Sequence, residues 1–120
     1  MEILEAPAFT RLLHDYLDDE QYRALQTELI RNPDAGDVMP GTGGFRKMRW
    51  ADSQRGKGRR GGLRVIYYYF EGDRQIWLMT LYGKNESADL SPAEKRALKS
   101  AIEQEKAMRA AQRASRADRR

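Results

Sequence analysis

The 120-residue sequence contains no cysteine and a single histidine. Without thiols the chain can form no disulfide and offers no thiolate ligand, and one imidazole leaves zinc coordination almost excluded. We therefore expect a site without metal or cofactor. Long apolar stretches are also missing, since the longest, Val65 to Phe70, is far too short to span a bilayer. The first residues lack the basic and apolar regions of a signal peptide, so the expected compartment is the cytoplasm.

What the sequence does have is positive charge gathered in two blocks. Residues 45–64 hold eight basic side chains and one acidic, and residues 106–120 hold six and one, in a chain with a net charge of +4. The segments outside these blocks are net acidic. Concentrated positive charge is typical of surfaces that meet phosphates or acidic proteins. For the second block a solvated tail is the simpler interpretation, and the first block becomes the candidate working surface.

Hydropathy patterns predict one α+β domain over residues 1–105, followed by a basic helical extension or tail over residues 106–120. Asp18 with Gln21 forms the pattern of a helix-capping box, and Ser91 with Glu94 forms another. We expect the order β-α-α-β-β-β-α: a strand over 2–6, a helical hairpin over 7–32, strands over 45–50, 63–70 and 75–82, and a helix from Ser91.

The expected sheet is small and antiparallel. Its helices are expected to pack on one face and to leave the other face at least partly open. Between the last two strands, Glu71 to Arg74 form a tight hairpin turn in which Gly72 is free to take a positive φ.

One glycine motif invites a nucleotide-binding interpretation that we reject. Gly56 to Gly61 match the spacing of the dinucleotide fingerprint. That fingerprint needs a helix directly after the glycines, whose N-terminus meets the pyrophosphate, and here a strand follows. A basic hairpin loop is the better interpretation, and its side chains could still contact phosphates.

The candidate catalytic residues lie on the predicted strands. They are Lys47, Arg49 and Arg64, with Tyr82 and Lys84 at the end of the last strand. Lysine and arginine are rare on buried strand faces, so the set indicates an exposed surface that binds phosphates, or simply a charged outer face of the sheet. Further RNA-binding candidates surround them in sequence: Arg46, Trp50, Arg55, Lys57, Arg59 and Arg60.

Such a set is chemically sufficient to cleave RNA without a metal. Attack by the neighbouring 2′-hydroxyl needs a base for that hydroxyl, an acid for the leaving oxygen, and positive charge for the pentacoordinate phosphate. Arginine supplies the charge, a lysine among other cations can act as a base, and a tyrosine can act as an acid or a base.

Four segments in sequence order carry a likeness to a known family. The chain resembles the RelE/HigB toxins of bacterial toxin–antitoxin pairs, and is most similar to the HigB branch. The likeness covers roughly residues 1–105 and rests on the segments Gly41–Trp50, Gly58–Tyr69, Ile76–Lys84 and Leu90–Leu98.

The resemblance implies a ribosome-dependent mRNA endonuclease that acts from the open side of its sheet. Lys47 and Arg49 match the basic pair on the family's second strand, and Arg64 matches the arginine that opens the third. The implied partners are the 70S ribosome with its mRNA and a HigA-like helix-turn-helix antitoxin, whose complex would bind operator DNA. We expect Lys47 to act as base or to stabilise the base, the two arginines to bind the phosphate, and Tyr82 or Lys84 to complete the set.

The sequence also departs from the family's pattern. No arginine occurs in the segment 83–86 and no tyrosine follows Tyr82, so the identity of the general acid stays open. Two other functions remain as alternatives. One is a ParE-like toxin, which shares the fold but inhibits DNA gyrase by protein contact. The other is a module that binds nucleic acid or protein without catalysis.

Overall fold

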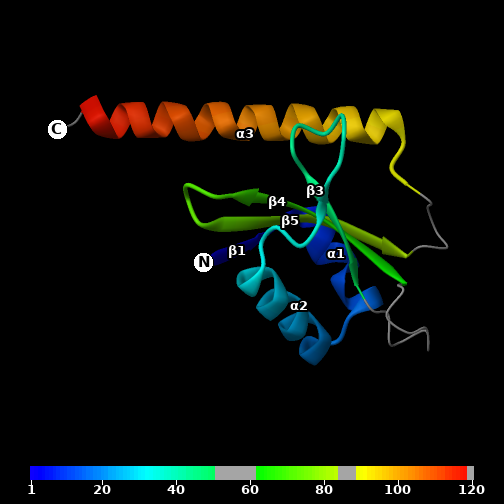
Figure 1. Cartoon of the computed structure of the whole chain (residues 1–120). Helices are drawn as coiled ribbons and strands as arrows, with labels where there is room; N and C mark the ends of the chain where they lie inside the picture. The colour runs from blue at the N-terminus through cyan, green and yellow to red at the C-terminus, as the bar shows by residue number, and fades with distance from the viewer. Residues whose placement is uncertain (51–61, 84–88, 119–120) are drawn as a thin grey trace.

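A five-stranded sheet lies between helices on its two faces (Figure 1). The computed structural model describes residues 1–50, 62–83 and 89–118. The expected α+β class is confirmed, and a short strand in the segment 34–44 changes the expected order. The elements are β1 (Glu2–Glu5), α1 (Pro7–Tyr16), α2 (Asp19–Arg31), β2 (Asp37–Val38), β3 (Arg46–Trp50), β4 (Leu63–Phe70), β5 (Gln75–Gly83) and α3 (Pro92–Asp118).

The sheet is mixed, so the prediction of a wholly antiparallel sheet was wrong. Its strand order is β1-β5-β4-β3-β2. The strands from β2 to β5 pair antiparallel with their neighbours, whereas β1 pairs parallel with β5, with Ile3 opposite Ile76. A long stretch of chain separates β1 from β5 in the sequence. No local sequence signal therefore predicts which strand β1 pairs with or in which direction.

The first helical layer packs where the sequence predicts it. Asp18 caps α2: its side chain accepts a hydrogen bond from the Gln21 backbone N–H at 2.7 Å, and the Gln21 side chain accepts one from the Asp18 N–H at 2.9 Å. This confirms the capping box. Phe9 of α1 and Leu25 of α2 are fully buried, and they join one face of the sheet in the larger of two apolar clusters.

Helix α3 covers the opposite face, so the prediction that all helices pack on one face was wrong. Ile102 is fully buried there, in a second cluster that includes Phe45, Ile66 and Phe70. Figure 1 shows α3 running across the sheet on the side away from α1 and α2. The reason lies in the central strands, which present apolar side chains on both faces and therefore need cover on both.

Two cations fasten the C-terminal half of α3 to the β4–β5 hairpin. The Arg109 guanidinium lies 3.7 Å from the centre of the Phe70 ring, and its nitrogens lie 2.7 Å from a carboxylate oxygen of Asp73 and 2.8 Å from one of Glu105. The Lys106 ammonium lies over the Tyr68 ring at 5.0 Å. The helix continues without interruption past residue 105, and its basic stretch is helical as far as Asp118.

The glycine-rich connection before β3 packs tightly under α3. Gly43 has a φ of +77°, and a Cβ atom placed on it would lie 2.8 Å from Cγ2 of Ile102, so this position needs glycine. The hydroxyl of buried Thr42 donates to the Met39 carbonyl at 2.8 Å and accepts from the Phe45 N–H at 3.1 Å. These contacts fix the start of β3.

The hairpin between β4 and β5 turns as the sequence predicts, but at a different residue. Arg74 takes the left-handed conformation with a φ of 52°, whereas Gly72 keeps a φ outside that region. The expectation for Gly72 was therefore wrong. The turn is closed by a hydrogen bond from the Arg74 N–H to the Glu71 carbonyl at 3.2 Å.

Candidate functional site

Three of the predicted catalytic residues form one row across adjacent strands. Arg49 of β3 is the register partner of Arg64 of β4, and Arg64 is the partner of Tyr82 of β5. Met48 belongs to the cluster under α1 and α2, and so do Leu63, Val65 and Leu81. Because side chains alternate along a strand, the three residues of the row point to the opposite face, the side of α3.

A β-bulge in β5 makes this row possible. The pairing of β4 with β5 shifts between Ile66, opposite Thr80, and Tyr67, opposite Leu78, so Met79 is an extra residue in β5. Before the bulge, Ile76 and Leu78 face α1 and α2; after it, Leu81 does, and Tyr82 faces α3. A regular strand would turn Tyr82 toward α1 and α2, away from Arg64.

The two arginines of the row differ in burial. Arg64 is 9% exposed and donates a hydrogen bond to the Leu63 carbonyl at 3.2 Å, whereas Arg49 is exposed. Like charges directly opposite each other on neighbouring strands destabilise a sheet. Arginine matches the geometry of a phosphate well, and an oxyanion held by both side chains would offset their repulsion.

Tyr82 completes the row with a neutral phenol. Burial raises the pKa of this phenol above its ordinary value, the Asp89 and Glu94 carboxylates raise it further, and the Arg64 charge opposes them. Its hydroxyl is buried and has no hydrogen-bond partner among the residues that the structure describes. A neutral phenol is in the protonation state that a proton donor needs.

Tyr82→Phe is expected to separate activity from stability. In an RNA-cleaving site, loss of this proton donor should lower cleavage by about 100-fold or more. The unfolding free energy should stay the same or rise by up to about 1 kcal/mol, because a buried hydroxyl without a partner is removed. Cleavage kinetics and urea denaturation measure the two effects. A clear loss of stability would show that the hydroxyl supports the fold.

The raised pKa also predicts how the stability of the two proteins depends on pH. Folding favours the neutral phenol of Tyr82, so this stabilisation is complete below about pH 10 and is lost as the pH rises through the folded-state pKa. Tyr82→Phe should therefore lose less stability than the wild type between pH 9 and about pH 11. If both proteins lost the same stability over this pH range, the raised pKa would not belong to Tyr82.

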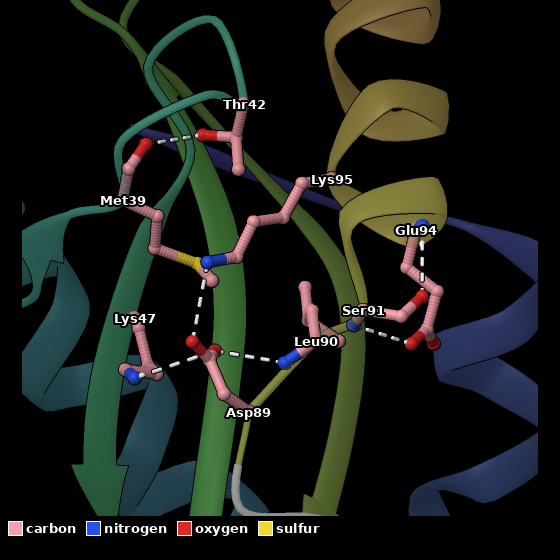
Figure 2. A network of polar contacts seen from close by, with 8 residues as sticks. All are labelled: Met39, Thr42, Lys47, Asp89, Leu90, Ser91, Glu94 and Lys95. Atoms are coloured by element: carbon pink, nitrogen blue, oxygen red, sulfur yellow. Dashed lines mark hydrogen bonds and ion pairs between the residues drawn. The ribbon is translucent and has the colours of Figure 1, made fainter.

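Lys47 lies two residues before Arg49 on the same face of β3, and it belongs to a second group of charges (Figure 2). Its ammonium lies 3.7 Å from one oxygen of Asp89, whose other oxygen lies 3.2 Å from the ammonium of Lys95 on α3. The Leu90 N–H donates to Asp89 at 2.7 Å. This hydrogen bond first, and then the two lysines, hold the pKa of the Asp89 carboxyl below its usual range.

Sequence reasoning missed Asp89 and Lys95. Asp89 stands two residues before Ser91, whose side chain forms the expected capping box with Glu94 (Figure 2). A carboxylate at this position resembles one more helix-capping residue. Only the packing of α3 on the sheet brings it to Lys47, so no local signal could have identified it.

An open groove follows the outer edge of β3 beside these charges. Its volume is about 830 Å³. Its lining includes three cations and three carboxylates: Lys47, Arg49 and Lys95, and Glu28, Asp37 and Asp89. Strand β2 pairs with β3 only at Lys47 and Arg46. The groove therefore lies where the sheet edge passes beyond this short strand.

The remaining predicted residues divide into two groups. Arg46 and Trp50 alternate with Lys47 and Arg49, so they face α1 and α2; Arg46 donates to the Gly36 carbonyl at 2.8 Å and pairs with Asp34 at 3.3 Å. The structure thus does not bring Arg46 together with the row, whereas Trp50 borders the same groove as Lys47 and Arg49. The others, Arg55, Lys57, Arg59, Arg60 and Lys84, lie outside the described residues.

A scan of the chain against models of known protein families finds no match. The likeness to RelE/HigB toxins therefore stays a prediction from the sequence. Within the described ranges, no helix is both long and apolar enough to cross a membrane. The same ranges contain no group of three or more histidine, aspartate or glutamate side chains placed to hold a metal ion.

Proposed function

We propose that this chain is a toxin of the RelE/HigB type, a ribosome-dependent endoribonuclease that cleaves translated mRNA in the ribosomal A site and so inhibits translation. The observation that carries the proposal is the row of Arg49, Arg64 and Tyr82 across three strands, with Lys47 beside it on the same face. Two guanidinium groups and a neutral phenol are suited to a phosphate that loses an oxygen.

Each residue takes one part of the reaction. A solvent water accepts the proton of the ribose 2′-hydroxyl as its oxygen attacks the adjacent phosphorus. The bond from phosphorus to the 5′-oxygen breaks, Tyr82 gives its proton to that leaving oxygen, and the phenolate then regains a proton from water. Arg49 and Arg64 bind the phosphate oxygens and stabilise their growing negative charge. The Lys47 ammonium stabilises the charge that develops on the 2′-oxygen. None of these steps uses a metal ion or a cofactor.

The proposed partners follow from this activity. The substrate is mRNA held by the 70S ribosome in the cytoplasm, and a HigA-like helix-turn-helix antitoxin inhibits the toxin and brings the complex to operator DNA. A polar face with clustered cations fits a phosphate-rich surface such as the ribosome. The chain has an isoelectric point near 9.5, which favours association with RNA.

The decisive experiment uses translating ribosomes and the purified full chain. We expect cuts in the mRNA at codon-phased positions, mapped by primer extension, and no cuts when Lys47 and Arg49 are both changed to glutamine. DNA gyrase supercoiling is measured in parallel. Intact mRNA with inhibited gyrase would replace the nuclease proposal by the ParE-like alternative. Intact mRNA with unaffected gyrase would favour a binding module.

A further inference from the structure

Asp89 lies between two ammonium groups that come from different layers of the fold. Lys47 stands on β3 and Lys95 on the first turns of α3, and Figure 2 shows the Asp89 carboxylate between their side chains. Two lysines that converge on one carboxylate can also converge on one phosphate, because both anions offer several oxygens to an ammonium group. The place that the Asp89 carboxylate occupies could therefore also hold another anion.

The contacts within this group are of an exchangeable kind. The side chains of Lys47, Asp89 and Lys95 are 31%, 45% and 27% exposed, and their ion pairs span 3.7 and 3.2 Å. Ion pairs with this much exposure stabilise a fold only weakly, and a lysine side chain readily follows a new partner. A phosphate carried into the groove can therefore take the place of the carboxylate.

The distance from Lys47 to Arg49 matches the spacing of successive phosphates in RNA. Lys47 and Arg49 are two residues apart on one strand, which separates them by about 7 Å. Successive phosphates of an extended single strand of RNA are spaced comparably. With one phosphate at Arg49 and Arg64, a neighbouring phosphate of the strand would be within reach of Lys47, and Lys95 lies across Asp89 from Lys47.

We propose that Lys47 and Lys95 form a second phosphate-binding site of the RNA groove, and that Asp89 is an internal counterion that occupies this site until RNA binds. The inference rests on the proposed RNA-binding function and adds Lys95 to the residues that contact the substrate. It makes Asp89 a competitor of the RNA. Removal of the Asp89 charge should then strengthen RNA binding. If Asp89 instead positioned Lys47 for catalysis, removal of its charge would weaken RNA binding.

The experiment measures binding of a fluorescent RNA hexanucleotide whose 2′-oxygens are all methylated, so that the probe cannot be cleaved. Asp89→Asn keeps the shape and the acceptor for the Leu90 N–H, and it should bind the probe about three- to tenfold more tightly, as expected for the release of two exposed ion pairs. Lys95→Gln should bind several-fold more weakly. For this variant, the slope of the logarithm of the binding constant against the logarithm of the salt concentration should become less steep by about 0.7. That is the contribution of one phosphate contact in a single strand.

Lys106→Gln is the matched control. It removes the same charge from the same helix, but its ammonium lies over the Tyr68 ring rather than beside Asp89. Binding by this variant should change less than twofold. Thermal unfolding of all three variants checks that the fold is retained, and Lys95→Gln tests the site independently of Asp89→Asn.

The results distinguish this inference from the proposed function. Tighter binding by Asp89→Asn with no mRNA cleavage on ribosomes would support the phosphate site and overturn the nuclease. Cleavage by the wild type with unchanged or weaker probe binding by Asp89→Asn would overturn the counterion role alone. Equal losses for Lys95→Gln and Lys106→Gln, or no probe binding by any of the proteins, would also overturn the site.

Discussion

Arg64→Ala is expected to lower mRNA cleavage on ribosomes by about 100- to 1000-fold, the usual cost of removing one group that stabilises a developing oxyanion. Arg64 is the middle member of the row and is only 9% exposed, so its guanidinium acts in a drier environment than that of Arg49. A charge in such an environment interacts more strongly with a phosphate. Rates of cleavage under single-turnover conditions measure the loss.

Two variants show whether this loss belongs to the chemistry. Arg64→Lys keeps the charge but not the planar guanidinium, so it should recover only part of the rate. Arg113→Ala removes an exposed arginine from α3 and should leave the rate within about twofold of the wild type. Circular dichroism confirms the fold of each. Full activity of a folded Arg64→Ala protein would remove Arg64 from the site.

Ile102→Ala is expected to reduce the unfolding free energy by about 2–5 kcal/mol. Ile102 is fully buried and is the one buried residue within the described part of α3. Alanine is a strong helix former, so the change tests packing rather than helix propensity. Urea denaturation measures the loss, and hydrogen exchange of the α3 amides shows whether the helix leaves the sheet before the rest unfolds.

Met108→Ala is the matched control on the same helix. Met108 is 51% exposed, so its replacement should change the unfolding free energy by no more than about 0.5 kcal/mol. Release of α3 should also withdraw Lys95 from the groove, so Ile102→Ala is expected to bind RNA more weakly as well. If Ile102→Ala lowered the unfolding free energy by less than about 1 kcal/mol, α3 would be held on the sheet mainly by Arg109 and Lys106.

Local signals in the sequence predicted the elements well. The bounds of β4 agree at both ends with the β-branched and aromatic run from Leu63 to Phe70, and the two capping boxes begin α2 and α3 as expected. These features depend on neighbours within a few residues. Their side chains and backbone meet in any compact arrangement of the chain, so pattern alone identifies them.

Features that depend on distant contacts were not predictable. The parallel place of β1 beside β5 and the side on which α3 packs depend on the whole arrangement of the chain. The same holds for the site. The strand cations were found because lysine and arginine are unusual on strands, whereas Asp89 became visible only through its ion pair with Lys47.

The extra residue in β5 has a consequence for how such chains can diverge. Met79 lets one strand present Leu78 to one helical layer and Tyr82 to the opposite side of the sheet. Loss or gain of one residue between them would exchange the two sides of every position that follows. Homologous chains with a regular strand here should therefore carry the tyrosine one position earlier or later. Among homologous chains, the length of this strand and the position of the tyrosine would then change together.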